Sequence, residues 1–210
     1  MKLFIYQHCP FCARVAYVAN TLNLELEYQV VDYADAQTLM DLTGQKQVPV
    51  LQKEDGSVMA ESLDIMAYFF AKGGQEVKNT ARNETLDFQR ESLPLLQKIG
   101  YPRWPALGLR EFATSHSIDT WQKKKQTADL NFAQLLANTA MIVDEVNGQL
   151  LKAEQHLQLS HEESELPLID QAIYFSLLRG WAVEPSMVWP KALRAWLENK
   201  SIELNIGLLA

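Results

Sequence analysis

Apolar and polar residues are spaced differently before and after residue 72 of this chain. In the first part, short apolar runs alternate with stretches of helical periodicity. Residues 24–31 alternate apolar and polar positions with period two, which indicates a half-exposed strand, and Asp55-Gly56 between two apolar runs indicates a hairpin. The pattern predicts strands over 2–6, 24–31, 48–51 and 58–60, and helices over 10–21, 35–42 and 63–71.

The element order β-α-β-α-β-β-α predicts a small mixed sheet that carries helices. A β-α-β start implies a parallel pair of strands with a right-handed crossover, and the hairpin adds an antiparallel strand. After a linker over 73–79 the strand signals fade, so we expect an α/β domain over 1–72 and an all-α domain over 80–210. In the second domain the pattern predicts helices over 81–99, 120–138, 139–156, 168–180 and 190–200, with the first region broken up by Pro94, Pro102 and Pro105.

Composition and charge narrow the class of protein. The 210 residues include 48% hydrophobic and 21% charged side chains, as in an ordinary globular protein. A formal net charge of −7 argues against a nucleic-acid partner, because such surfaces are usually basic. The N-terminus lacks the apolar segment of an export signal, and no stretch approaches the ~18 apolar residues of a membrane helix. We therefore expect a cytoplasmic location and no membrane partner.

The two cysteines form one motif, Cys9-Pro10-Phe11-Cys12, at the turn from the first strand into the first helix. The free N–H groups and the positive dipole end of a helix N-terminus stabilise a thiolate, which is the reactive form of cysteine. We expect Cys9, at the exposed end of the helix, to attack a disulfide. Cys12 should be more buried, have the higher pKa and resolve the mixed disulfide that results.

Two structural alternatives for this motif are weaker than redox chemistry. A disulfide between Cys9 and Cys12 would close a very short loop and remove little entropy from the unfolded chain. Half a zinc site would need about two more ligands, and the sequence has no second C-x-x-C pair. We therefore expect no metal.

Val48-Pro49 places a proline in an apolar strand, where it costs a ladder hydrogen bond unless it lies at an edge or a bend. One interpretation is a cis-proline beside the dithiol, which would expose the backbone of Val48 to an extended peptide or thiol ligand. The other is an ordinary trans-proline in an edge strand. The residues alone do not decide between a cis-proline and a trans-proline.

Glu61-Ser62 opens a predicted helix. In the structural interpretation, Ser62 is the N-cap and accepts from backbone N–H groups. In the functional one, the Glu61 carboxylate holds an amino acid's ammonium group, while Ser62 and the helix end hold its carboxylate.

Taken together and in this order, Cys9-Pro10-Phe11-Cys12, residues 45–51 and residues 61–65 resemble the glutaredoxin 2 family, the large bacterial glutaredoxins. The resemblance covers the whole chain, with further similar segments at 130–137 and 206–209. It implies a thioredoxin-like domain followed by a glutathione-transferase-like helical domain. It also implies glutathione-dependent reduction of disulfide-containing or glutathionylated proteins. We expect a monomer.

The resemblance also implies roles for particular residues. Cys9 would be the nucleophile and Cys12 its resolving partner. Val48 would meet the cysteinyl part of glutathione beside a cis-Pro49, and Glu61 and Ser62 would hold the γ-glutamyl group. The glutathione-binding residues expected on this basis are Cys9, Pro10, Phe11, Val48, Pro49, Glu61 and Ser62.

The chain departs from the family pattern at two places. Phe11 stands where a tyrosine is usual, which should alter a ligand contact more than the thiol chemistry. In the helical domain, Asp170 fits the usual pattern of a central helix, but Pro167 stands where a Ser or Thr cap belongs. That second departure concerns folding rather than activity.

Two other functions use the same fold. A glutathione transferase needs a thiol-activating group other than a resolving cysteine, so Cys12 argues against it. A non-catalytic interaction protein would not be expected to keep both Cys12 and Glu61.

We assign most other conspicuous residues to structure. Lys123-Lys124-Lys125 is expected to be a solvated helix face. The five tryptophans are expected in the helix-packing core, with Trp104 and Tyr101 as candidates for lining a groove for the second substrate between the domains. His8 either tunes the pKa of Cys9 or is an exposed bystander, and Arg14 is expected to lie clear of the thiols.

Overall fold

The computed structural model describes residues 1–74, 81–159, 163–164 and 166–210. Of the expected linker over 73–79, residues 75–79 therefore lie outside the described part. The α/β part consists of β1 (Lys2–Ile5), α1 (Pro10–Thr21), β2 (Glu27–Val30), α2 (Gln37–Thr43), β3 (Val50–Gln52), β4 (Val58–Met59) and α3 (Ser62–Lys72). The helical part consists of α4 (Asn83–Gly100), η1 (Trp104–Ala106), η2 (Arg110–Phe112), α5 (Ser115–Lys125), α6 (Phe132–Ala137), α7 (Thr139–Leu157), α8 (Leu168–Trp181) and α9 (Lys191–Glu203).

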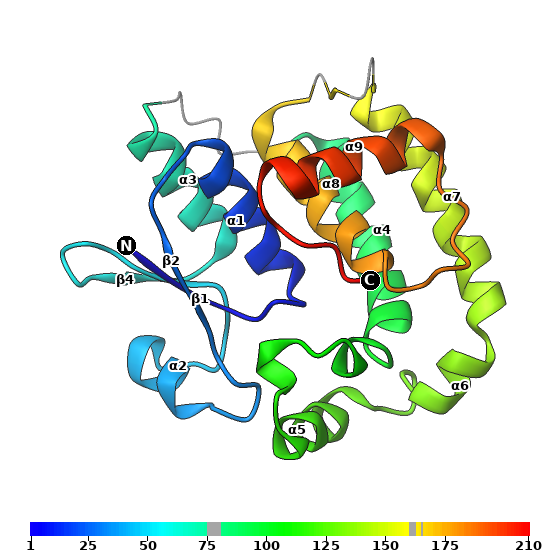
Figure 1. The fold of residues 1–210 in the computed structure, drawn as a ribbon, viewed down its shortest axis with the longest axis horizontal. Coiled ribbons are helices and arrows are strands. Elements are labelled where there is room, and N and C mark those ends of the chain that lie inside the picture. The colour runs from blue at the N-terminus through cyan, green and yellow to red at the C-terminus, as the bar shows by residue number, and fades with distance from the viewer. Residues whose placement is uncertain (75–80, 160–162, 165) are drawn as a thin grey trace.

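The four strands form one sheet in the order β2-β1-β3-β4. β1 pairs with β2 in parallel, Lys2 opposite Glu27, and with β3 antiparallel, Leu3 opposite Leu51. Helices α1 and α3 cover one face of the sheet, and α2 lies on the other (Figure 1). The predicted mixed sheet is thus confirmed, although β2 is shorter than the alternating pattern over 24–31 indicated.

Helix α4 continues through Pro94, contrary to the prediction that this proline breaks it. An internal proline loses one backbone hydrogen bond and crowds the preceding turn. Here α4 packs along α7 and α8, and the exposed Pro94 ring faces away from them. Tertiary packing therefore outweighs the local cost. Pro102 and Pro105 lie beyond the end of the helix.

The single helix predicted over 120–138 is wrong, because the chain forms two helices there. Helix α5 ends at Lys125 and α6 begins at Phe132. The side chain of Asn131 accepts a hydrogen bond from the N–H of Gln134 at 3.0 Å. This N-cap satisfies one of the free N–H groups of α6 and fixes its start.

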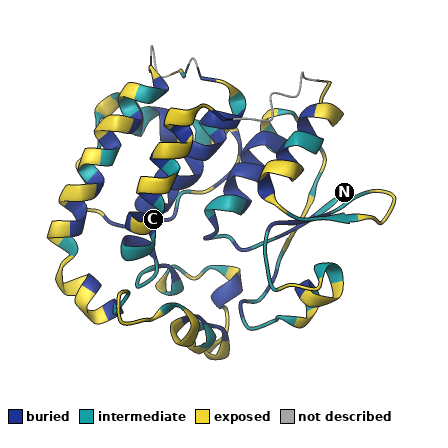
Figure 2. Cartoon of the chain, turned by 180° about the vertical axis from the view of Figure 1, so that it is seen from behind, coloured by how far each residue is buried: buried dark blue, intermediate teal, exposed yellow. Residues whose placement is uncertain are grey.

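Helix α8 lies at the centre of the molecule, packed on α1 and on α4. Figure 2 shows buried residues facing this centre and exposed residues on the outer faces of the helices. Pro167 precedes α8 without a capping side chain. Asp170 is buried, and its carboxylate accepts from the N–H of Arg82 at 2.9 Å, so it joins the start of α8 to the start of α4.

Candidate active site at the dithiol

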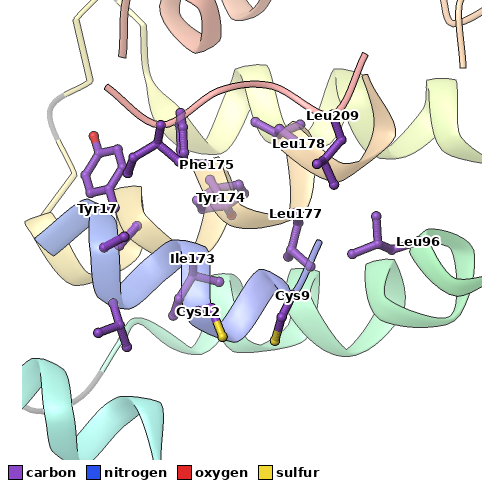
Figure 3. Packing of buried hydrophobic residues seen from close by; sticks show 14 of the residues in the cluster. Cys9, Cys12, Tyr17, Leu96, Ile173, Tyr174, Phe175, Leu177, Leu178 and Leu209 are labelled. Carbon is purple, nitrogen blue, oxygen red and sulfur yellow. The ribbon is translucent and has the colours of Figure 1, made fainter. Parts of the chain in front are cut away.

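Cys9 is the N-cap residue of α1 and Cys12 lies one turn inside the helix. Figure 3 shows the two sulfur atoms pointing the same way in the buried cluster that also includes Ile173 and Leu177 of α8. The prediction of an exposed Cys9 needs correction: Cys9 is 8% exposed and Cys12 is 2% exposed. The helical part covers the end of α1, so Cys9 is open only to the cleft between the two parts.

The two thiols differ in acidity. A hydrogen bond from the Cys12 thiol lowers the pKa of Cys9, and the N–H groups of Cys12 and Phe11 and the charge of Arg14 act in the same direction, against burial. Burial raises the pKa of Cys12 well above its ordinary value. Cys9 is therefore the more acidic of the two thiols and ionises before Cys12.

Arg14 takes part in the site, contrary to expectation. It is buried, and its Nε donates to Ser62 Oγ at 3.0 Å, with a second bond from Nη2 to the same oxygen. Its Nη1 donates to Gln89 Oε1 at 2.7 Å, and its guanidinium lies 4.7 Å from the ring centroid of Phe11. Burial lowers the pKa of Arg14 to about 10, so it remains a cation at neutral pH.

Five of the seven residues expected to hold glutathione line one hollow of about 140 Å³, while Cys9 and Pro10 line a neighbouring cleft. The Val48–Pro49 peptide bond is cis, so the alternative of a trans-proline is wrong. Among the described residues, none hydrogen-bonds to the N–H or C=O of Val48. The hollow is lined by Phe11, Arg14, Gln47, Val48, Pro49, Glu61 and Ser62.

Ser62 does not cap α3 as predicted. The helix begins at Ser62 after Glu61, and no side chain caps it. The Ser62 hydroxyl instead accepts from Arg14, which lies across the hollow on α1. Glu61 is exposed, with φ of 66°, a left-handed conformation in which a non-glycine residue is strained.

A cleft of about 200 Å³, lined by Cys9, separates the α/β part from the helical part. Tyr101 and Trp104 line it, as proposed for the groove of the second substrate. Lys124 and Lys125 line it too; Lys123 and Lys124 are exposed, as predicted for the basic run, while Lys125 is partly buried. The cleft shares Phe11, Gln47 and Val48 with the hollow, and Cys9 lines the cleft.

His8 is buried, which excludes an exposed bystander. Its backbone N–H donates to Glu111 Oε1 at 2.9 Å, and its Nδ1 lies 2.9 Å from the same oxygen. The imidazole stacks on Trp104 and on Phe112. Burial lowers the pKa of His8, so the neutral imidazole is favoured.

Two residues of the helical part that were not singled out in the sequence hold the segment before Cys9. Glu111 binds His8, and Arg179 donates to the C=O of Gln7 at 2.9 Å. Both are buried and lie more than 100 residues from their partners, so no local pattern marks them.

No group of three or more His, Cys, Asp or Glu side chains in the described ranges could hold a metal ion. Among the described helices, none is long and apolar enough to cross a membrane.

Comparison with known proteins decides the family. The family model "Glutaredoxin 2, C terminal domain" matches residues 84–210, and "Glutathione S-transferase, N-terminal domain" matches residues 3–76. The chain belongs to the glutaredoxin 2 family. Its sequence is 28% identical to glutaredoxin 2 of Escherichia coli (strain K12), over 100% of this chain and 98% of that protein.

Solved structures agree with this glutaredoxin 2 assignment. Glutaredoxin 2 of Salmonella typhimurium, determined in complex with glutathione, superposes with a TM-score of 0.88 and 26% identity. The match covers 99% of this chain and 96% of that one. Gtt2 of Saccharomyces cerevisiae matches with a TM-score of 0.62 and 14% identity over 96% of each chain, which shows the fold alone. The expected thioredoxin-like domain with a glutathione-transferase-like helical domain is thus confirmed.

Proposed function

We propose that this member of the glutaredoxin 2 family is a glutathione-dependent thiol–disulfide oxidoreductase in which Cys9 is the nucleophile. The single observation that carries the proposal is the asymmetric dithiol. The pKa of Cys9 is lowered and that of Cys12 is raised, and Cys9 lines the cleft, which shares Phe11, Gln47 and Val48 with the hollow. A thiolate on Cys9 can reach a disulfide that has one half in the hollow and the other in the cleft.

The reaction follows from that geometry. The Cys9 thiolate attacks the glutathionyl sulfur of a mixed disulfide, the old S–S bond breaks, and the substrate sulfur leaves as a thiolate that takes a proton from solvent. The thiolate of a second glutathione then attacks the Cys9–glutathione disulfide, which releases glutathione disulfide and restores the Cys9 thiolate. With a protein disulfide, Cys9 first forms a mixed disulfide with one protein sulfur. The deprotonated Cys12 then attacks Cys9, the bond to the protein sulfur breaks to release the reduced protein, and the Cys9–Cys12 disulfide that forms is reduced by two glutathiones, which leave as glutathione disulfide.

The hollow supports binding of the glutathionyl half. The free N–H and C=O of Val48 would pair with the cysteinyl backbone, and Pro10, Phe11 and Pro49 would pack around it. Glu61 would take the γ-glutamyl ammonium, and the start of α3 at Ser62 would take its carboxylate. Arg14, which donates to Ser62 Oγ, adds a positive charge beside Ser62 in the hollow.

The finer expectations remain predictions: glutathionylated or disulfide-containing proteins as substrates, a monomer, and a reducing cytoplasmic location. Of the alternative functions, conjugation of electrophiles is disfavoured by Cys12, since a transferase has no use for a resolving thiol. A purely non-catalytic role is disfavoured because nothing in it requires a lowered pKa at Cys9.

The test is reduction of two substrates by three proteins. Wild type should reduce both a small glutathione mixed disulfide and a protein disulfide, with glutathione and a reductase as the electron source. Cys9→Ser should lose both activities. Cys12→Ser should keep the first and lose most of the second, because only that reaction needs a second thiol. Full activity in Cys9→Ser would falsify the proposal.

A further inference from the structure

The cleft beside Cys9 is lined by three lysines that make no ion pair with a described carboxylate, although the charges of Asp32 and Asp35 act on Lys46. Lys46 comes from the loop before Val48, while Lys124 and Lys125 come from the end of α5. In the described part of the chain, the lysine ion pairs involve other residues, namely Lys2, Lys72, Lys152 and Lys200. The cleft is therefore a positive region in a chain whose formal net charge is −7.

Aromatic side chains hold two of these lysines in place. The Nζ of Lys125 lies 5.0 Å from the ring centroid of Tyr101 and 5.6 Å from that of Trp121. The Nζ of Lys46 lies 4.7 Å from the Tyr33 ring centroid and donates to the Tyr33 C=O at 2.5 Å. Cation–π contacts fix an ammonium group without neutralising its charge.

The lysines also destabilise one another. Burial, and then the charge of Lys124, lowers the pKa of both Lys46 and Lys125. The Cys9 thiolate acts in the opposite direction on Lys125. Carboxylates placed in the cleft would relieve this repulsion, and they would find two partly desolvated cations, Lys46 and Lys125, beside the exposed Lys124.

The position of α5 shows which half of a substrate would meet Lys124 and Lys125. The hollow proposed for the glutathionyl half is lined by α1, α3 and the Val48 loop. Lys124 and Lys125 lie outside it, on the helical side of the cleft. A disulfide that bridges the two sites therefore places its non-glutathione half against these lysines.

We propose that Lys124 and Lys125 make the enzyme selective for glutathionylated protein segments in which acidic side chains flank the modified cysteine. The apolar parts of such a segment would lie on Tyr101, Trp104 and Trp121, and its carboxylates would pair with the lysines. This inference rests on the proposed function and adds a substrate class to it. Because the positive charge of the cleft acts on substrate capture, we expect the lysines to change mainly KM and the association rate.

The first experiment compares three glutathionylated peptides that differ only beside the cysteine, with two Glu, two Gln or two Lys. At low salt we expect kcat/KM to fall in the order Glu, Gln, Lys, by about 3- to 10-fold at each step. The differences should shrink at 0.5 M salt, where the Debye length is about 4 Å and contacts between partly exposed charges are screened. Equal kcat/KM values for the three peptides would overturn the proposal.

The second experiment uses charge-neutral variants with a matched control. Lys125→Gln and Lys124→Gln should each reduce the preference for the Glu peptide over the Lys peptide, through KM. Lys123→Gln removes an exposed charge of the same run outside the cleft and should leave the preference unchanged. An equal loss in Lys123→Gln would show a general charge effect and contradict the assignment to the cleft.

A neutral substrate separates this inference from the proposed function. The mixed disulfide of glutathione with 2-mercaptoethanol has no charge on its non-glutathione half. Because the Lys125 charge also interacts with the Cys9 thiolate, the selectivity of Lys125→Gln is measured as kcat/KM for each peptide divided by kcat/KM for this neutral substrate, and activity on the neutral substrate shows that the variant is folded. If wild type fails on this substrate, the proposed function itself is wrong. If wild type reduces it but does not distinguish the peptides, only the selectivity is wrong.

Discussion

At the scale of single residues, the fold changes the titration of His8 in the pH range where stability is easily measured. Its imidazole is enclosed by aromatic rings, and burial lowers its pKa even though the carboxylate of Glu111 acts against this shift. The positive charges of Lys125 and Arg179 also face it and lower the pKa further. The folded protein therefore keeps His8 neutral at a pH where the unfolded chain protonates it.

This difference predicts a pH-dependent stability. An unfolded histidine titrates near pH 6.5, so below that pH the unfolded chain binds a proton that the folded chain does not. The contribution of His8 is full above about pH 6.5 and is lost as the pH falls. Urea unfolding between pH 8 and pH 5 should show a free energy of unfolding that decreases by up to about 1.4 kcal/mol per pH unit from this residue.

His8→Asn supplies the test, because an amide can still donate to Glu111 but does not titrate. The variant should be less stable at pH 8 and should show a smaller loss as the pH is lowered. The exposed His116 provides the control, and His116→Asn should keep the wild-type slope. An unchanged slope in His8→Asn would mean that another group causes the pH dependence.

The sequence revealed residues whose role depends on near neighbours and missed those that depend on distant ones. Cys9 and Cys12 could be recognised because the strand-to-helix turn that positions them is itself local. Arg14 was misjudged because its partner, Ser62, lies 48 residues away. Lys125 looked like part of a solvated face because only the folded chain places the end of α5 across from Cys9.

At the scale of elements, the end of α4 is shaped by one close contact. Gly100 is the last residue of the helix, and a Cβ added there would overlap the indole of Trp104. That indole is fully buried, stacks on His8 and lines the cleft. The absence of a side chain at position 100 thus lets one wall of the cleft pack against α4.

Gly100→Ala should therefore lower the free energy of unfolding by about 1–3 kcal/mol, the usual cost of overpacking. It should also raise the KM for peptide disulfides, since Trp104 must move. Urea unfolding and steady-state kinetics measure the two effects.

Gly148→Ala is the matched control, because Gly148 lies exposed inside α7 with no heavy atom within 4 Å of an added Cβ. Alanine there should raise the free energy of unfolding by about 1 kcal/mol through helix propensity. The steric argument fails if both substitutions change stability in the same direction.

The helices show why element boundaries were only partly predictable. The start of α1 could be predicted because Pro10 fits the first turn of a helix. Pro94 misled the prediction because its local cost is outweighed by packing of α4 on α7 and α8. The break before α6 was missed although Asn131, a good N-cap residue, precedes it; the apolar spacing continues across that break.

At the scale of the whole molecule, the α/β and helical parts share one apolar core. Helix α8 packs along both α1 and α4. Hydrogen bonds cross the same boundary: Tyr17 Oη donates to Gln171 Oε1 at 3.0 Å, and Arg179 donates to the C=O of Gln7 at 2.9 Å. Separating the two parts would expose apolar surface and leave buried polar groups unpaired.

We therefore predict that the two parts unfold in one cooperative transition, although a chain of 210 residues could unfold in two. The sequence provides independent probes, because all five tryptophans lie in the helical part and both cysteines lie in the α/β part. In Cys9→Ser, reaction of Cys12 with a thiol reagent reports opening of α1, and tryptophan fluorescence reports the helical part. The two signals should change at the same urea concentration.

Arg179→Met should shift both midpoints downward together, since it removes the bonds to Gln7 and Gly207. If Cys12 became reactive at lower urea than the fluorescence midpoint, the α/β part would unfold separately, and the contacts across α8 would be weaker than their burial indicates.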